Sequence, residues 1–172
     1  MENGAILVHA GRILAVGPNA TIKISSRATV IDCNGLVVTA GFWNSHVHIL
    51  TPGLLHAEKL SSEQITAQLQ EMLTRWGFTT VFDIASVLEN TNLIRRRIES
   101  GEVRGPRILT VGEPFWGKGG TPIYVKGFLE ANHIVIPEVE STTQATGRGA
   151  RRSVTAQTAS RSLQIPSRQM AS

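Results

Sequence analysis

The chain has 172 residues and a formal net charge of +4, with 41% apolar and 17% charged residues. These proportions are typical of a protein that buries a hydrophobic core, and the length allows one domain or slightly more. The positive charge comes from residues 147–172, which contain five arginines and no acid, whereas residues 1–146 contain 12 basic and 13 acidic side chains. The main part of the chain is therefore near neutral, which argues against a basic nucleic-acid-binding domain.

The sequence also bears on the compartment. No apolar run approaches the roughly 18–20 residues that span a bilayer, and the residues after Met1 lack the basic and apolar regions of a signal peptide. Cys33 is the only cysteine, so it cannot form an internal disulfide. We therefore expect a reducing, cytoplasmic setting with no membrane partner.

Residues 4–39 are predicted to form a small antiparallel β unit. His9–Arg12 and Asn34-Gly35 have the composition of tight turns, and the second is typical of a type I′ turn. Apolar and β-branched runs beside these turns predict strands at residues 5–8, 13–16, 29–32 and 36–39. Such a unit has little room for a core of its own.

Strands and helices are predicted to alternate after residue 41. Ser61 and Gln64 form a capping box ahead of an apolar helical face, and Gly77 and Gly101 stand where two helices should end. The pattern predicts strands at 42–49, 78–82 and 107–111, and helices at 61–76 and from Asn90 or Thr91 to residue 100. This alternation indicates βα units and a parallel sheet.

The last part of the chain has a different composition. Residues 112–127 are predicted to be a glycine-rich loop, and Phe128–Glu130 to be helical. Residues 147–172 are dominated by Arg, Ser, Thr, Gln and Ala without visible periodicity. We expect a disordered basic tail there, because this composition cannot bury enough apolar surface to order itself.

The clearest chemical signal is the segment Ser45-His46-Val47-His48-Ile49. Residues two apart in a strand point to the same side, so His46 and His48 are predicted to lie side by side while Val47 and Ile49 face the other layer. Two neutral imidazoles suit a divalent metal at about 2.0–2.1 Å from nitrogen. A His-x-His pair also arises often by chance, so the pair alone leaves its role open.

The surrounding segments resemble the amidohydrolase superfamily of metal-dependent hydrolases, in its imidazolonepropionase- and prolidase-like branch. Thr39–His48 resembles the family signature Pro-Gly-hydrophobic-x-Asp-x-His-x-His, with Ala40 and Asn44 in place of the proline and the aspartate. Four further matches follow the family's order, at residues 8–17, 30–38, 76–83, and 105–109 with 119–120.

The resemblance implies an α/β fold in which a small β-sandwich segment is followed by the first three or so βα units of a truncated (β/α)8 TIM-type barrel. The sandwich segment would be residues 1–41 and the partial barrel residues 42–146. A complete barrel needs about 250 residues, so most of one would be missing. Residues 147–172 would be the disordered tail, and out-of-frame translation is the simplest hypothesis for them.

The resemblance also implies roles for single residues. His46 and His48 would be ligands of a divalent metal, zinc being the most suitable. Asp83, at the end of the second strand, is either close to the site or a strand-terminal cap or turn residue, and the two interpretations have equal weight. Gly119 and Gly120 would shape a loop on the substrate side, and Thr121 stands where the family often has a histidine.

The family hydrolyses carbon–nitrogen bonds of small-molecule amides and cyclic amides with a metal-activated water. This chain has two of about five expected ligands and no match to the family's catalytic aspartate, so we assign no catalytic residue and expect the chain alone to be inactive. A non-enzymatic binding module and weak nucleic-acid binding through the arginine-rich tail are the alternatives. The second is disfavoured because the tail lacks stacking aromatics. The sequence favours no substrate and no oligomeric state.

Overall fold

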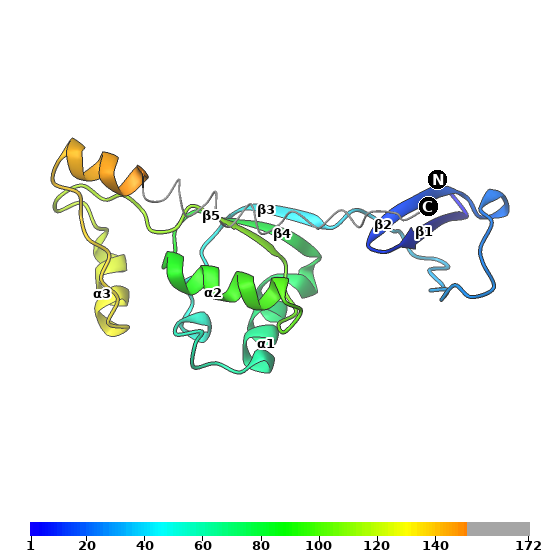
Figure 1. Ribbon diagram of the computed structural model, residues 1–172, viewed down its shortest axis with the longest axis horizontal. Helices are drawn as coiled ribbons and strands as arrows, with labels where there is room; N and C mark the ends of the chain where they lie inside the picture. The colour runs from blue at the N-terminus through cyan, green and yellow to red at the C-terminus, as the bar shows by residue number, and fades with distance from the viewer. Residues whose placement is uncertain (151–172) are drawn as a thin grey trace, which may run out of the picture. The chain divides into compact units, whose positions relative to one another are not determined.

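The computed structural model describes residues 1–150. They form two compact units, the first of residues Met1–Thr39 and the second beginning at Ala40 (Figure 1). Most of the predicted tail, residues 151–172, lies outside the described residues. No helix in the described part of the chain is long and apolar enough to cross a membrane.

The first unit is built on one β-hairpin. Strands β1 (Gly4–His9) and β2 (Arg12–Pro18) pair in antiparallel register, and the short helix η1 (Asn19–Thr21) follows. Ala10 and Gly11 form the two-residue loop with φ of 47° and 73°. Both angles are positive, as a type I′ turn requires. This turn type is favoured in hairpins because its twist matches that of the paired strands. The strands predicted at 5–8 and 13–16 are therefore confirmed.

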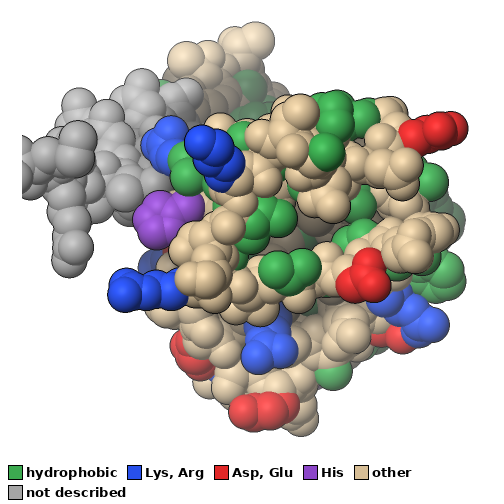
Figure 2. All heavy atoms as spheres, turned by 90° about the vertical axis from the view of Figure 1, so that its right-hand side faces the viewer, with side chains coloured by type: hydrophobic (Ala, Val, Ile, Leu, Met, Phe, Trp, Pro, Cys, Tyr) green, Lys and Arg blue, Asp and Glu red, His purple; other side chains and the backbone are tan. Residues whose placement is uncertain are grey.

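The strands predicted at 29–32 and 36–39 are wrong, and the described residues of this unit form a hairpin rather than a sandwich. The turn between them does form, since the Leu36 N–H donates to the Cys33 carbonyl at 2.9 Å, but Asn34 lacks the positive φ of a type I′ turn. Without a paired neighbour, the apolar side chains stay in water, with Ile31 81% and Val37 89% exposed. Hydrophobic groups are visible at the surface in Figure 2.

The second unit contains a parallel sheet, as predicted. Strands β3 (Phe42–Val47), β4 (Phe78–Asp83) and β5 (Arg107–Thr110) lie in the order β3-β4-β5. The register between β3 and β4 shifts between Asn44 and Val47, where three residues of β3 span two of β4. This bulge lies one residue before the end of the strand and changes how its last side chains are aimed.

Helix α1 (Ser62–Met72) begins at the predicted capping box. The Ser61 hydroxyl accepts from the Gln64 N–H at 3.2 Å, and the Gln64 side chain accepts from the Ser61 N–H at 2.8 Å. The helix ends earlier than predicted, because the chain tightens into η3 (Thr74–Trp76) before Gly77 adopts φ of 82°. Trp76 consequently turns out of the core and is 59% exposed.

Helix α2 (Leu88–Glu99) begins before the predicted caps at Asn90 or Thr91. The Leu88 N–H donates at 3.0 Å to the carboxylate of Glu113, which comes from the loop after β5. Asn90 instead links its side chain to the backbone of the segment between β3 and α1, accepting from the Ala57 N–H at 2.9 Å. A long-range cap of this kind leaves no local sequence signal.

The end of the described chain is more helical than the sequence predicts. Helix α3 (Ile123–Ala131) starts inside the expected loop, and a further helical segment covers residues 142–150. That segment crosses the predicted tail boundary, and Arg148 donates to the Pro137 carbonyl at 2.6 Å and lies 5.0 Å from the Phe115 ring centre. Residues 147–150 are thus helical, where the sequence predicts disorder.

One core joins the sheet to α1 and α2. Both helices lie on the same side of the sheet in Figure 1, and η2 (Pro52–Leu54) helps to close the core beside them. The buried apolar residues are Ile49, Leu54, Ala57, Ile65, Leu69, Leu73, Val81, Ile94, Val103 and Ile108. Ile49 is fully buried and Val47 packs against this core, as their alternation with the two histidines predicts.

Replacing Ser61 with alanine should lower the free energy of unfolding of the second unit by about 1 kcal/mol, because the Gln64 N–H loses its acceptor. Urea unfolding followed by tryptophan fluorescence measures this, since all three tryptophans lie beyond Thr39. Ser62→Ala is the control, because the Ser62 hydroxyl has only a 3.4 Å contact with Glu63. Equal losses in the two variants would contradict the capping account.

Candidate metal centre

The candidate site lies at the carboxyl edge of the parallel sheet. His48 directly follows β3, Asp83 ends β4, and Thr110 ends β5. The carboxyl ends of parallel strands meet at one edge, which is where open and closed parallel sheets place their ligands. The sheet topology therefore gathers these side chains although they are up to 62 positions apart in sequence.

His46 and His48 are neighbours in space. Their ring centroids are 5.4 Å apart and the ring planes meet at 85°. Both residues are exposed, so solvent and small solutes reach them. This separation is compatible with one ion at about 2.0–2.1 Å from a nitrogen of each ring. The donor chemistry of the pair thus fits two positions of a divalent metal site.

A backbone carbonyl fixes the state of His48. Its Nδ1 lies 3.1 Å from the carbonyl oxygen of Ala85. Because a carbonyl can only accept, Nδ1 must carry the proton in this contact, and Nε2 is left with the lone pair in the neutral ring. Histidines that bind metals usually have this type of orienting partner on the second nitrogen.

His46 is oriented through its backbone. Its N–H donates to the side-chain oxygen of Asn44 at 3.0 Å, which holds the bulge at residues 45 and 46 in place of a ladder bond to β4. Exposure alternates over residues 46–49 as the sequence predicts, with both histidines exposed and Ile49 buried, and the register shift between Asn44 and Val47 lies directly beside the pair.

Asp83 is completely buried and has three donors. Its Oδ1 accepts from the Ile49 N–H at 3.2 Å, and its Oδ2 accepts from the Thr110 hydroxyl at 2.6 Å and from the Ser86 hydroxyl. Thr91 extends the network through a 2.8 Å bond from its hydroxyl to that of Ser86. The side chain therefore joins the ends of all three strands and lies behind His48 in the wall of the site.

The described residues offer no third ligand beside the two histidines. No group of three or more His, Cys, Asp or Glu side chains within residues 1–150 could hold a metal ion. A catalytic zinc site normally has three protein ligands and a water. The pair alone would therefore not make a complete catalytic zinc site within this range.

Gly119 and Thr121, on either side of Gly120, are held by a residue that the sequence analysis did not single out. Glu138 accepts from the Gly119 N–H at 2.6 Å, from the Thr121 N–H at 3.1 Å and from the Thr121 hydroxyl at 2.6 Å. These bonds, the Thr121 hydroxyl first, lower the pKa of Glu138 from 4.5 to about 2. The structure thus pairs this loop with Glu138, whereas it pairs the two histidines with each other.

Sequence reasoning missed Ser86, Thr110 and Glu138. Ser86 and Thr110 carry a weak signal, since each lies within four residues of a predicted strand end, where polar groups gather at the edge of a parallel sheet. Glu138 has no local signal, because its partners are 17 and 19 positions away.

Comparisons with known proteins agree with this architecture. A dihydroorotase of Solibacter usitatus is 40% identical over 76 residues, which are 44% of this chain and 16% of that protein. A dihydroorotase of Aquifex aeolicus is 29% identical over 122 residues, 69% of this chain and 27% of that protein. No protein-family model matches the chain.

Solved structures give the same result. A crystal structure of an amidohydrolase aligns with a TM-score of 0.52 and 28% identity, covering 69% of this chain and 29% of that one. The chain resembles the amidohydrolase superfamily. A prolidase complexed with N-methylphosphonate-L-proline has the same fold, with a TM-score of 0.55, 24% identity and coverage of 86% of this chain and 39% of that one.

The chain spans less than a third of the length of the two dihydroorotases described above.

Replacing Asp83 with alanine should lower the stability of the second unit by at least about 2 kcal/mol, because three buried or partly buried donors lose their acceptor. Urea unfolding followed by tryptophan fluorescence measures the change. Asp32→Ala is the matched control, since Asp32 is exposed and accepts from the Asn34 N–H in the first unit. If Asp83→Ala changed the stability as little as this control, the network would not organise the edge.

The carboxyl carbon of Glu138 should titrate in NMR with a midpoint of about 2. Because the pKa is depressed in the folded chain, the stability from this clamp is complete above about pH 4.5 and is lost as the pH falls toward 2. Thr121→Val should raise the midpoint by removing the largest cause, whereas Thr121→Ser keeps the hydroxyl and should leave it low. A midpoint of 4.5 in the unaltered chain would refute the clamp.

Proposed function

We propose that the chain is the part of a metal-dependent amidohydrolase that carries the first two metal ligands, His46 and His48. The whole protein would hydrolyse a carbon–nitrogen bond of a small amide or cyclic amide. The observation that carries this proposal is the histidine pair at the carboxyl end of β3, with the Nδ1 of His48 held 3.1 Å from the Ala85 carbonyl. The prolidase and dihydroorotase names of its relatives support the same bond type.

A bound divalent ion, zinc being the most suitable for imidazoles, supplies Lewis acidity that activates water for attack on a carbonyl. The chain's own residues prepare that site. Ala85 orients His48, Asn44 fixes the backbone of His46, and Asp83 ties Ile49 to the ends of the neighbouring strands. Asp83 is a positioning residue in this proposal, because all its described partners are protein donors.

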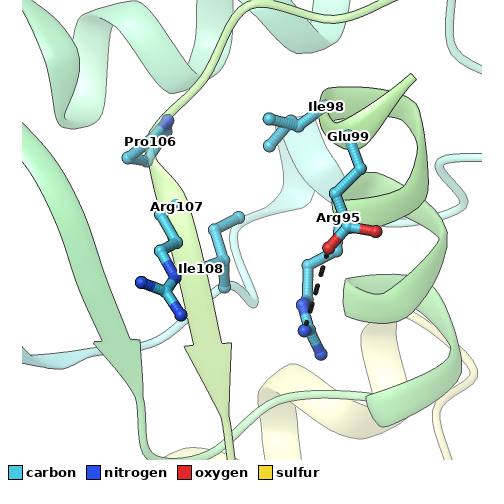
Figure 3. A pocket seen from close by; sticks show the side chains of 6 residues that line it. All are labelled: Arg95, Ile98, Glu99, Pro106, Arg107 and Ile108. Atoms are coloured by element: carbon cyan, nitrogen blue, oxygen red, sulfur yellow. Dashed lines mark ion pairs between the residues drawn. The ribbon is translucent and has the colours of Figure 1, made fainter. Parts of the chain in front are cut away.

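We further propose that the sheet is the start of a (β/α)8 barrel that continues past β5. Within the described residues β5 pairs only with β4, so its other edge is open. Beside that edge a shallow cavity of about 180 Å³ lies between α2 and β5 (Figure 3). Its lining residues are Arg95, Ile98, Glu99, Pro106, Arg107 and Ile108.

Figure 3 shows apolar side chains (Ile98, Pro106 and Ile108) and charged side chains (Arg95, Glu99 and Arg107) around this cavity. The Arg95 Nε is buried and has no hydrogen-bond partner among residues 1–150, and its 4.0 Å ion pair with Glu99 is long. A buried donor without a partner is costly, so a neighbouring element that supplies an acceptor would stabilise the site. These properties suit the surface on which the next βα unit of a barrel would pack.

Zinc titration followed by NMR tests the ligand assignment. The ring signals of His46 and His48 should shift together on addition of zinc, and His46→Ala should weaken the binding at His48 about 10-fold or more, because one of two donors is lost. His9→Ala is the control, since His9 lies in the first unit, and should leave the binding unchanged. Equal zinc affinity in the His46→Ala variant and the unaltered chain would contradict the assignment.

An activity assay tests the remaining part. We expect the zinc-loaded chain to hydrolyse neither the cyclic amide dihydroorotate nor a proline dipeptide, because residues 1–150 contribute only two ligands. Hydrolysis at enzyme-like rates would refute the inactivity of the chain without refuting the two ligands.

The alternatives lead to other outcomes. A binding module without metal would show no response of the two histidine rings to zinc. Binding of nucleic acid would depend on the arginines of the basic tail, most of which lie outside the described residues. Nucleic-acid binding and the cytoplasmic location both stay predictions.

A further inference from the structure

The glycine-rich loop after β5 presents a group of donors to a carboxylate. The Gly119 N–H donates to Oε2 of Glu138 at 2.6 Å, and the N–H and hydroxyl of Thr121 donate to Oε1 at 3.1 and 2.6 Å. Both oxygens are therefore engaged, each by a different part of the loop. This two-pronged arrangement matches the planar shape of a carboxylate.

The shape of the loop has support other than Glu138. The Gly120 N–H donates to the Gly117 carbonyl at 2.8 Å, and Gly119 has φ of 71°, which a residue with a side chain rarely adopts. The chain also pairs with Val139 on both sides, because Val139 N–H donates to Trp116 at 2.7 Å and Val139 carbonyl accepts from Lys118 at 3.1 Å. The donors should thus remain in place when the Glu138 side chain is removed.

Two lysines lie near the loop, and one of them is already paired with an acid. Lys126 contributes to the lowered pKa of Glu138, and Lys118 is 76% exposed with Glu140 at 3.4 Å. Helix α3 begins two residues after Thr121 and has no side-chain cap, so its first N–H groups add partial positive charge near the loop in sequence. The Gly119 and Thr121 N–H groups meet the same carboxylate from either side of Gly120, whose own N–H is bound to Gly117.

The loop is accessible to solutes. Gly119 and Gly120 are exposed, and Glu138 and Thr121 are only half-buried. An external molecule can therefore reach the donors once the Glu138 side chain swings away. The carboxylate of Glu138 is held by hydrogen bonds with no direct ion pair described, and so it can be exchanged for a carboxylate of another molecule.

We propose that the loop Gly117–Thr121 is a binding site for the carboxylate of a small molecule, and that Glu138 is an internal competitor that occupies it in the absence of that ligand. The site does not depend on the metal or on the barrel of the proposed function. It assigns to Glu138 the role of a self-ligand that an anionic ligand must displace.

An internal competitor lowers the apparent affinity for the external ligand. The apparent affinity equals the intrinsic affinity multiplied by the fraction of molecules in which the site is open. Minor states in proteins are typically populated to about 0.1–10%. Removal of the Glu138 side chain should therefore tighten the binding of a carboxylate by at least about 10-fold.

The test is an NMR titration of the full chain with acetate, monitored at the amides of Gly119 and Thr121. Glu138→Ala should bind acetate at these amides at least about 10-fold more tightly than the unaltered chain. Acetamide, which has the same shape without the charge, should cause no shift. Glu140→Ala is the matched control, because it removes a neighbouring acid and leaves Glu138 in the loop, and it should behave like the unaltered chain.

Two further variants keep the test decisive if Glu138→Ala loosens the loop. Glu138→Gln preserves the size of the side chain and should still bind acetate more tightly than the unaltered chain. Thr121→Val in the Glu138→Ala background should lose most of the gained affinity, because one of the three donors is missing. The proposal is overturned if acetate shifts these amides in neither Glu138 variant, or if inorganic phosphate binds there and acetate does not.

Discussion

The carboxylate of Asp83 is the constraint on which the second unit depends. It lies fully buried at the end of the middle strand and takes a hydrogen bond from the end of each neighbouring strand, through Ile49 and Thr110. Burying a carboxylate costs free energy unless hydrogen-bond donors surround it. The ends of the three strands are therefore held where these donors reach the Asp83 carboxylate. Ser86 completes the set and directs the turn that carries Ala85. Packing of Val81 and Ile108 holds the sheet against the helices. The hydrogen bonds of the Asp83 carboxylate determine the conformation of the chain at the carboxyl edge of the sheet.

This constraint explains how His48, the proposed metal ligand, is held in place. The residue lies between Val47, the last of β3, and Ile49, whose N–H is bound to Asp83. Its ring meets the carbonyl of Ala85, two residues after Asp83. Both the backbone of His48 and its orienting partner therefore belong to segments fixed by the same carboxylate. Asp83 acts on the histidine through position, and under the proposed function that position would serve metal binding.

Local signals predicted the parts of the fold whose cause is local. The capping box at Ser61 and the hairpin loop at Ala10 formed as expected, because each depends on residues close in sequence. The prediction was wrong where residues distant in sequence determine the structure. One example is the start of α2, where Glu113, in the loop after β5, accepts from the Leu88 N–H. For the candidate site, the spacing of the two histidines predicted their proximity, but the register shift beside them and the clamp by Glu138 depend on tertiary pairing.

The central claim is that the edge of the sheet sets His48 in one tautomer, with the proton on Nδ1 and the lone pair of Nε2 free for a ligand. Long-range nitrogen–proton NMR of the metal-free chain in alkaline buffer measures this directly. The account predicts a protonated Nδ1 and an unprotonated Nε2 in His48, and loss of this preference in Asp83→Ala. A proton on Nε2 in the unaltered chain would contradict it.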